Sequence, residues 1–411
     1  MLDYLQSTGQ VNPEIQLTAE KYVATGYQRL LTFEVPGGGY SLFGQAPAEV
    51  FLTAYGLMEF SDMAEVHPVD PEVITRTAAW LAAQQSADGS WAPDAGGIAE
   101  GAINNYQNDT YRTTAYVLWA LVEAGYEGGA VSSAVGYLQS RSAEAADSYS
   151  RVIAAQALIA AGAGLDLAND FLDELAEEAS VDEQAAHWGA EEGSSGLTYS
   201  MGDAHVLETT ALVADAFLRA GRHGDLAQQG LTYLVRNKDS FGNWQTTQAT
   251  IYALRAMIRS IEASTTTAEG TIDIYHNGEL VHSLDVTEAD SDIFRQIDLK
   301  EHVVEGGENL VEVVMTGTGS LMYQTVGTYW TPWEDTPEEP MGAMSIDVSY
   351  DRTNLEVDDT VTASVTLTNN TSGSLMMVLV DLGIPPGFDL QTDDLDALVA
   401  DGLFRRYERA G

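Results

Sequence analysis

Histidine and cysteine supply many catalytic bases, nucleophiles and metal ligands, and this sequence offers little of either. It has no cysteine, which excludes thiolate nucleophiles, disulfides and cysteine-ligated zinc. Its histidines form no pair at i, i+4 and no His-Glu-x-x-His motif. They are His67, His187, His205, His223, His276, His282 and His302. A zinc site would need ligands from distant segments, so we predict no metal-ligating, cofactor-binding or catalytic residue.

Three of the histidines have neighbours that indicate ordinary structural roles. His67 precedes Pro68 in a loop, and His276 falls in a predicted hairpin turn, so we expect both side chains to be solvated. His187 stands next to Trp188, which is more typical of a packing pair than of a catalytic base.

One acidic motif, Asp393-Asp394-Leu395-Asp396, invites comparison with the aspartate motifs of terpene cyclases. Those enzymes are α/α toroids, and QQSADGSW (Gln84–Trp91) resembles their Gln-x-x-x-Asp-Gly-x-Trp motif. The acid order nevertheless differs from the Asp-x-Asp-Asp of a class II cyclase, and the motif lies in a β-rich region. We interpret it as the acidic first turn of a helix. The turn motif then supports a fold and says little about function.

Composition narrows the possible partners. The chain has 62 Asp plus Glu against 18 Lys plus Arg, a net charge of -44, spread along the whole length. Such a surface repels phosphate backbones and anionic lipid, which argues against nucleic-acid and membrane-surface partners. Solubility or adaptation to high salt explains the acidity. With 45% hydrophobic residues the chain is expected to fold, and 411 residues predict two or three domains.

Neither end has the features of a natural terminus. Residues 1–10 have no basic or apolar region of a signal peptide and predict the end of a helix already begun. The chain also stops abruptly after residues 403–411, and no apolar run approaches the roughly 20 residues that span a bilayer. We therefore expect the sequence to be a fragment.

Apolar segments that follow one another at intervals of tens of residues predict a repeat architecture. Asp109–Leu121 is an acidic start, a Thr pair and a nearly unbroken apolar run, and similar segments recur. They are 48–60, 148–161, 207–220 and 246–257. Between them lie amphipathic segments with one apolar stripe. A helix that is apolar all round must be enclosed, so the pattern predicts an α/α toroid with apolar helices inside and striped helices outside.

The predicted helical pairs are 13–33 with 48–62, 70–86 with 109–124, 128–140 with 147–162, 168–179 with 206–220, and 224–237 with 246–261. Asn12-Pro13-Glu14 and Asp70-Pro71-Glu72 each place a capping side chain before proline, which marks two of the helix starts. The connections pair glycine with aromatic residues, as in residues 37–44, 88–92, 196–200 and 241–244. Glycine allows a tight reversal, and we expect the aromatic residue to close the end of the ring.

After residue 267 the pattern changes to strands. Residues 271–286 alternate with period two around Asn277-Gly278, a strong hairpin signal. Residues 308–317 and 320–330 predict further strands, and 331–340 form a linker rich in proline and acids. A second β segment follows in 344–388, and residues 393–406 predict a short helix. The fold class is therefore α + β multidomain, a toroid followed by antiparallel β-sandwich modules.

Nine stretches in order resemble the C-terminal part of the alpha-2-macroglobulin and complement thioester-protein family. They are LDYLQSTGQ (2–10), TGYQRLLTF (25–33), YSLFG (40–44), FLTAYGLMEF (51–60), WLAAQQSADGSW (80–91), AHWG (186–189), ETTALVADAFL (208–218), GNWQTTQATIYALRAM (242–257) and MMVLVDLGIPPGF (376–388). The resemblance implies a thioester-type toroid domain over 1–263, truncated at its start. It also implies the returning half of a CUB-type β-sandwich over 268–335, and over 341–411 a macroglobulin-like receptor-binding domain truncated at its end.

Three departures from the family bear on chemistry. The family's thioester joins Cys and Gln of a Gly-Cys-x-Glu-Gln motif just upstream of the LDYL stretch, and this chain has neither that segment nor any cysteine. Hydroxyl-attacking members carry a histidine before the helix that matches Asp109–Leu121, but no histidine lies between Trp91 and Thr110. Vertebrate receptor-binding domains present a lysine pair where residues 393–406 offer aspartates.

The sequence therefore predicts a C-terminal fragment of an alpha-macroglobulin-type endopeptidase inhibitor, not an enzyme. Its parent would trap proteases outside the cytoplasm, in an extracellular, periplasmic or cell-surface location. No nucleic acid, membrane insertion or lipoprotein-type receptor is expected. The alternatives are a toroidal terpene cyclase or prenyltransferase, and a non-covalent adhesion or scaffold protein with a degenerate thioester domain.

Overall fold

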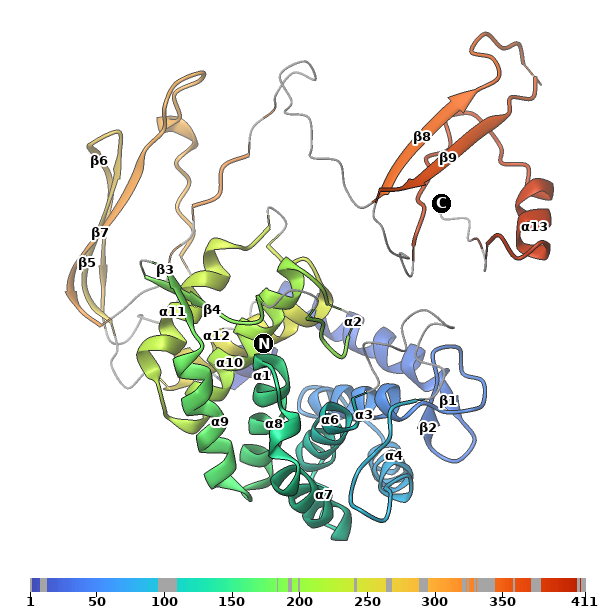
Figure 1. Ribbon diagram of the computed structural model, residues 1–411. Coiled ribbons are helices and arrows are strands. Elements are labelled where there is room, and N and C mark those ends of the chain that lie inside the picture. The colour runs from blue at the N-terminus through green and yellow to red at the C-terminus, as the bar shows by residue number, and fades with distance from the viewer. Residues whose placement is uncertain are drawn as a thin grey trace. The chain divides into compact units, whose positions relative to one another are not determined.

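Helical hairpins make up most of the first part of the chain (Figure 1). The computed structural model describes residues 2–7, 13–94, 109–182, 184–190, 194–198, 200–239, 242–263, 268–287, 295–319, 323, 325–328, 330, 344–357, 359–370, 378–404 and 407. The chain divides into two units, residues 1–336 and 337–411, and each is described by itself.

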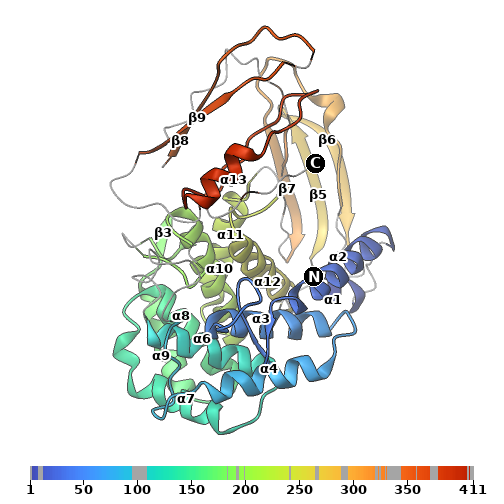
Figure 2. The same cartoon turned by 90° about the vertical axis from the view of Figure 1, so that its right-hand side faces the viewer.

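In the first unit, outer and inner helices alternate along the chain, as predicted. A short helix, α1 (Leu2–Ser7), comes first. The outer helices are α2 (Pro13–Leu31), α4 (Pro71–Ala83), α7 (Gly129–Ser140), α9 (Leu165–Glu177) and α11 (Gly224–Arg236). The inner helices are α3 (Val50–Ala64), α6 (Thr110–Glu123), α8 (Ser148–Ala161), α10 (Asp203–Ala220) and α12 (Thr247–Ala263). Figures 1 and 2 show them arranged as an α/α toroid, which confirms the predicted fold class.

Burial separates the two kinds of helix. In α6 every residue from Tyr111 to Leu121 is buried, and α8 and α10 are enclosed in the same way. The outer helix α9 buries only one stripe, of which Phe171, Leu172 and Leu175 are part. The prediction of full enclosure is wrong for α3 and α12, which stay partly exposed. Among the described residues, each of these two packs closely against a single other inner helix.

Three tryptophans close the connections that lead into inner helices, in one repeated arrangement. Trp91, Trp188 and Trp244 are almost fully buried, which confirms the packing role predicted for Trp91 and Trp244. Tyr199 and Phe241, for which the same role was predicted, lie outside the described residues. Each indole N–H donates to a backbone carbonyl oxygen near the end of the preceding outer helix. The three acceptors are the carbonyl oxygens of Leu81, Leu175 and Leu234, at 2.6–2.7 Å. Each tryptophan backbone N–H donates to a threonine hydroxyl of the next inner helix, those of Thr114, Thr210 and Thr250, at 3.0–3.1 Å. The recurring threonines are therefore acceptors that fix the loops.

Tyr40 takes the tryptophan's place in the first repeat. Its backbone N–H donates to the hydroxyl of Thr53 on α3 at 2.9 Å. The strands β1 (Glu34–Val35) and β2 (Gly39–Tyr40) form this connection. Glycine is required in the Trp91 connection, because Gly89 has φ +90° and a Cβ there would lie 2.4 Å from the carbonyl oxygen of Ser133.

A three-stranded antiparallel sheet follows α12 in the order β6-β5-β7. Its strands are β5 (Glu269–His276), β6 (Glu279–Val286) and β7 (Val311–Thr318). The predicted hairpin is confirmed, with Asn277 and Gly278 at φ 51° and 85°. The prediction of a strand over 320–330 is wrong for its described residues 323, 325–328 and 330, which pair with no neighbouring strand. A strand needs such a partner for its backbone hydrogen bonds.

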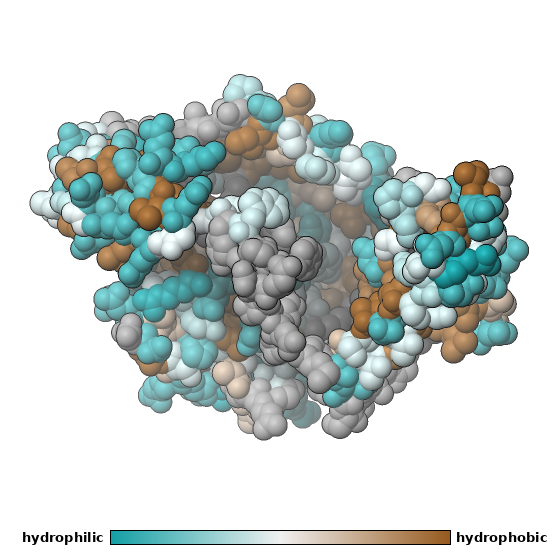
Figure 3. All heavy atoms as spheres, turned by 90° about the horizontal axis from the view of Figure 1, so that it is seen from above, coloured by the Kyte–Doolittle hydropathy of each residue, from teal (hydrophilic) through white to brown (hydrophobic). Residues whose placement is uncertain are grey.

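The second unit contains the hairpin of β8 (Met344–Tyr350) and β9 (Ala363–Asn369) and the helix α13 (Asp393–Ala400). The three aspartates in the first turn of α13 confirm that the acidic motif begins a helix. The strand expected around residues 376–388 is absent from the described part, 378–388. Apolar residues of the hairpin remain exposed, Ile346 by 49%. Figure 3 shows apolar spheres at the surface of this unit, on the right.

We predict that Thr210→Val destabilises the first unit by about 2 kcal/mol, because valine has the right shape but leaves the buried N–H of Trp188 without its acceptor. Urea unfolding followed by tryptophan fluorescence measures the change. Thr75→Val on the outer face of α4 is the control, because Thr75 is exposed and bonds only within its own helix. Equal stabilities for the two variants would contradict the prediction.

Candidate functional site: the mouth of the toroid

The N-terminal ends of α6, α8 and α10 bring buried polar side chains together at one end of the ring. The aspartates before α6 and α8 start these helices: Asp109 accepts from the backbone N–H of Arg112 at 3.0 Å, and Asp147 from that of Ser150 at 2.7 Å. Because both helices begin at the same end, their first turns face one another there. A connection between β4 (Ala185–His187) and α10 reaches into the same place.

Arg112 connects the elements that meet at this end of the ring, and only 7% of its surface is exposed. Its guanidinium donates to the hydroxyl of Ser150 at 2.7 Å, to the carbonyl oxygen of Ser195 at 2.8 Å, and to the carboxylate of Asp147. It also lies over the ring of Tyr149, 5.3 Å from the centroid. Burial by itself would raise the pKa of Asp147, but the charge of Arg112 and the bonds from Ser150 hold it below its ordinary value.

Glu208 of α10 is fully buried and has a different kind of neighbourhood. Its carboxyl group accepts from the hydroxyl of Tyr149 at 3.0 Å and from that of Thr198 at 3.1 Å, and Ser200 also bonds to it. Burial raises the pKa of Glu208 above its ordinary value of 4.5, although these hydroxyl donors act in the opposite direction.

Residues 194–198 and 200, here called the plug loop, cover the mouth. The N–H of Gly196 donates to the carbonyl oxygen of Ser200 at 3.0 Å, and the N–H of Leu197 donates to the hydroxyl of Tyr149 at 3.1 Å. Leu197 is 3% exposed and packs in the same core as the inner helices. A Cβ on Gly196 would lie 2.5 Å from the hydroxyl of Ser200 and 3.2 Å from the carboxyl group of Glu208, so a larger residue would displace these two side chains. The plug loop is thus held by α6, α8 and α10 together.

His205 also belongs to this cluster, none of whose members was given a role from the sequence. It is 1% exposed, its Nδ1 lies 3.3 Å from the hydroxyl of Ser200, and its ring packs against Tyr149. A serine, a histidine and the acid Glu208 therefore lie together beneath the plug loop. They are buried, so the arrangement stabilises the loop and offers no accessible nucleophile. In the sequence, only the short spacing of Ser200, His205 and Glu208 could have indicated that these side chains lie together.

The sequence analysis also predicted the side-chain environments of His187, His67 and His276. His187 stacks on Tyr233 with ring centroids 4.8 Å apart, so it packs as predicted, with Tyr233 as the ring partner in place of the neighbouring Trp188. The prediction of a solvated side chain is wrong for His276, which is buried and bonds to Asn309 at 2.9 Å. His67 is half-buried and packs edge-on against Tyr27. The segment 95–108, where the sequence lacks the family's histidine, lies outside the described residues.

Three described acids near the starts of the inner helices, Asp94, Asp109 and Asp147, accept structural hydrogen bonds. Asp94 caps α3 from a neighbouring connection by accepting from the N–H groups of Val50 and Phe51 at 2.8 and 3.1 Å. Asp109 and Asp147 cap their own helices. Among the residues that the structure describes, no three His, Asp or Glu side chains form a group that could hold a metal ion. The cyclase interpretation needs free acids or a metal at an open mouth, and this arrangement does not favour it.

A seam, defined by the contacts between α3 and α12, completes the ring. The amide of Gln248 donates to the hydroxyl of Tyr55 at 2.8 Å, and Arg255 pairs with Asp62 at 3.2 Å. Nearby, Arg219 pairs with Glu123 at 2.8 Å and so joins α10 to α6. Long polar side chains thus bridge α3 to α12 and α6 to α10.

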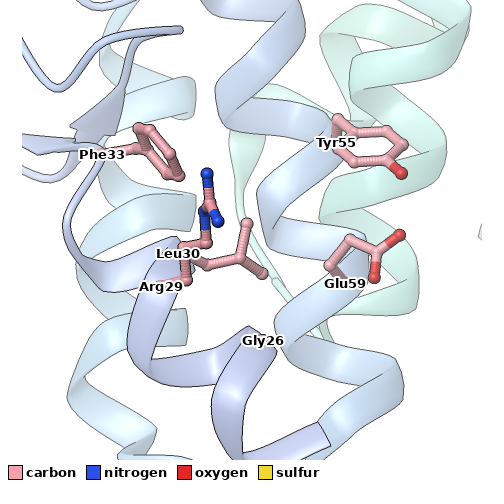
Figure 4. Close-up of a pocket in the computed structure, with 6 residues that line it drawn as sticks. All are labelled: Gly26, Arg29, Leu30, Phe33, Tyr55 and Glu59. Atoms are coloured by element: carbon pink, nitrogen blue, oxygen red, sulfur yellow. The ribbon is translucent and has the colours of Figure 1, made fainter. Parts of the chain in front are cut away.

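An open pocket of about 330 Å³ lies beside the seam, between α2 and α3 (Figure 4). It is lined by Gly26, Arg29, Leu30, Phe33, Tyr55 and Glu59. Burial raises the pKa of Glu59, while the bond from Tyr55 acts in the opposite direction. The pocket combines an apolar wall with one cation and one acid, and that acid bonds to the hydroxyl of Tyr55.

Comparison with known proteins agrees with this geometry. The model of the family described as the A-macroglobulin TED domain matches residues 1–259. The chain therefore belongs to the alpha-macroglobulin family, and the toroid is its thioester-type domain. Ovostatin of Gallus gallus is 25% identical over 427 residues, which cover 99% of this chain and 28% of ovostatin. The chain thus spans little more than a quarter of that relative's length. In the described part of the chain, no helix is long and apolar enough to cross a membrane.

We expect Arg112→Met to destabilise the first unit by about 3 kcal/mol, because it leaves Asp147 and the Ser195 carbonyl without their buried partner. Arg112→Lys should recover only part of the loss, since lysine lacks the planar fork. Amide exchange should accelerate in the plug loop more than in α9. The control is Arg141→Met, whose exposed pair with Glu144 is worth less than about 1 kcal/mol. An unchanged plug loop would contradict the role of Arg112.

Glu208 gives a prediction about pH. Folding raises the pKa of Glu208 above 4.5. Between pH 4.5 and the raised pKa, the folded protein therefore keeps a proton on this carboxyl group that the unfolded chain has released. The resulting stabilisation is complete below about pH 4.5 and is lost as pH rises through the raised pKa. Glu208→Gln does not titrate, so its unfolding free energy relative to wild type should increase over that range and then level off. Urea unfolding between pH 5 and 8 tests this, with exposed Glu262→Gln as the control. A pH-independent difference for Glu208→Gln would overturn it.

Proposed function

We propose that this chain is the C-terminal part of an alpha-macroglobulin-type endopeptidase inhibitor, in which the toroid carries and shields a reactive acyl group and turns over no substrate. The observation that carries the proposal is the match of the family's domain to residues 1–259, and the burial of Leu197 and Arg112 where the plug loop meets the inner helices supports it. The partners would be target proteases, met by the whole parent protein. The similarity to ovostatin supports an extracellular, periplasmic or cell-surface location.

We assign the remaining segments by the same resemblance. Residues 1–263 would form the thioester-type domain, 268–335 the returning half of a CUB-type sandwich, and 341–411 the start of a receptor-binding domain. The antiparallel sheet β6-β5-β7 supports the second assignment, because such a sheet is the kind of layer from which a β-sandwich is built. The exposed apolar residues of the β8–β9 hairpin, such as Ile346, support the third in the same way.

The proposed trap needs a thiol that this chain does not contain. In the parent, a cysteine and a glutamine upstream of the LDYL stretch would form the thioester. A lysine amine of the captured protease then attacks the acyl carbon, the amide bond forms, and the thiolate leaves. The parent, purified and mixed with a protease, should give a covalent product that survives denaturation, and parent pretreated with methylamine should give none.

The absence of cysteine in 411 residues favours one second candidate, a non-covalent scaffold with a degenerate thioester domain. The two candidates differ in the coding sequence upstream of Met1. A Gly-Cys-x-Glu-Gln motif shortly before the LDYL stretch supports the covalent trap. An upstream segment without cysteine supports the scaffold, and the toroid would keep its fold without its chemistry.

We predict that the activated parent prefers amines to alcohols. No histidine lies between Trp91 and Thr110, so that segment has no imidazole to take up the acyl group and pass it to a hydroxyl. Radiolabelled methylamine should therefore be incorporated at least tenfold faster than glycerol at equal concentration. Parent already inactivated with unlabelled methylamine is the control and should take up neither label. Comparable rates for the two nucleophiles would refute the prediction.

We also predict no binding to a lipoprotein-type receptor. The first turn of α13 carries Asp393, Asp394 and Asp396, so its charge is opposite to that of the lysine pair such receptors require. The full chain should give no response on an immobilised acidic receptor repeat at physiological salt. A vertebrate receptor-binding domain with the lysine pair is the positive control. Measurable binding of this chain would show the prediction to be wrong.

A further inference from the structure

The turn between β5 and β6 is formed by Asn277 and Gly278, the one Asn-Gly dipeptide of the sequence. An asparagine before glycine is prone to lose its side-chain amide, because glycine has no Cβ to shield the backbone nitrogen that attacks the carboxamide. Both residues are exposed, so water reaches them. By its local sequence, this turn is therefore a site of spontaneous chemical change.

The structure holds the carboxamide of Asn277 from both sides through the segment that leads into β7. Its Oδ1 accepts from the backbone N–H of Leu310 at 2.8 Å, and its Nδ2 donates to the carbonyl oxygen of Glu308 at 3.0 Å. The backbone N–H of Asn277 also donates to the carbonyl oxygen of Leu310 at 2.8 Å. While both ends of the carboxamide are bonded in this way, its carbon Cγ cannot turn toward the nitrogen of Gly278.

Asn309, which lies between the two partners, keeps their segment in place. Its Nδ2 donates to the carbonyl oxygens of Val304 and Gly307 at 3.0 Å, and its Oδ1 accepts from the N–H of Val304 at 2.8 Å. Nε2 of His276 lies 2.9 Å from the same Oδ1. The bonds that restrain Asn277 therefore depend on the segment before β7 and not on the β5–β6 hairpin alone.

We propose that Asn277 is a deamidation site which the fold keeps closed, and that it reacts when the segment before β7 leaves the hairpin turn. Among the described residues, β7 pairs with β5 alone and forms one edge of the sheet (Figure 2). An edge strand has partners on one side only, so it separates more readily than the strand at the centre. The carboxamide then becomes free to rotate.

The reaction uses water as its only co-reactant. The backbone nitrogen of Gly278 loses its proton and attacks Cγ of Asn277, the bond from Cγ to Nδ2 breaks, and ammonia leaves with that proton. Water then opens the cyclic imide. Attack of water at Cγ gives aspartate, and attack at the main-chain carbonyl carbon of Asn277 gives isoaspartate, in which the chain continues through the former side chain.

Either product weakens the contact with β7. The donor that the Glu308 carbonyl accepts is lost, and in aspartate a carboxylate oxygen takes its place, so two acceptors face each other. In isoaspartate the main chain of the turn is longer by one carbon. Because the ammonia is released, the change does not reverse. Asn277 thus converts a transient departure of β7 into a lasting loss of its attachment.

The first test compares the wild-type chain in native buffer and in guanidinium chloride at the same mildly alkaline pH. Peptide mapping by mass spectrometry measures aspartate and isoaspartate at Asn277 over time. Two hydrogen bonds restrain the carboxamide in the folded state, so its deamidation should be about tenfold slower, or more, in native buffer. Equal rates in the two solutions would overturn the proposal.

A second test separates the local restraint from the stability of the whole chain. Asn309→Ala removes the bonds that order the segment before β7, so in native buffer its Asn277 should react about tenfold faster than in the wild type. Ser283→Ala is the matched control, because it removes an exposed side-chain bond to Asp273 between β5 and β6 and leaves the β7 side intact. Equal native rates for the two variants would contradict the role of this segment.

Asn277→Asp reproduces one product and tests its consequence without the reaction. Amide exchange should accelerate in β7 by about tenfold and change less in β6, whose pairing with β5 does not involve Glu308. Unchanged exchange in β7 would show that deamidation does not release this strand. None of these measurements requires the thioester, so their outcome is independent of the proposed protease trap.

Discussion

The guanidinium of Arg112 is the interaction on which the mouth of the toroid depends. It bonds to the first turn of α8 through Ser150 and Asp147 and to the plug loop through Ser195. A buried cation is tolerated only when its donors are satisfied, so the plug loop and the helix start must be placed together. Glu208 holds the other end of the same loop through hydroxyl groups. The plug loop is therefore held by the guanidinium of Arg112 at one end and by the carboxyl group of Glu208 at the other, and Leu197 between them completes the apolar core.

Much of the toroid could be predicted from the sequence, because its determinants are local. Runs such as Asp109–Leu121 specify both a helix and its enclosure, and Asp70-Pro71 fixes a helix start that the structure reproduces. The family resemblance was equally accessible, since nine short stretches preserve their order. The contacts that could not be predicted join residues that are far apart in the sequence. Nothing in the Thr pairs indicated that Thr114 and Thr210 accept from the backbones of Trp91 and Trp188, more than 20 residues earlier.

The polar cluster at the mouth was missed for the same reason. Arg112, Tyr149 and Glu208 stand on three different helices, and each is an unremarkable residue in its own segment. His276 was misjudged because its hydrogen-bond partner, Asn309, lies 33 residues away. The strands expected over 320–330 and 376–388 depended on partners, and alternation alone cannot supply the neighbour to which a strand must bond. Periodicity therefore predicts elements well and predicts their meeting places poorly.

The seam between α3 and α12 has a consequence for the order in which the toroid assembles. Its two bonds, Tyr55 with Gln248 and Asp62 with Arg255, each join residues 193 positions apart. Neighbouring inner helices elsewhere meet after the much shorter chain of a single hairpin repeat. Because loop closure becomes less probable as the intervening chain lengthens, the hairpins form first and the seam closes last. The first and last helices of the ring find each other only when the curvature of all the intervening repeats is already in place.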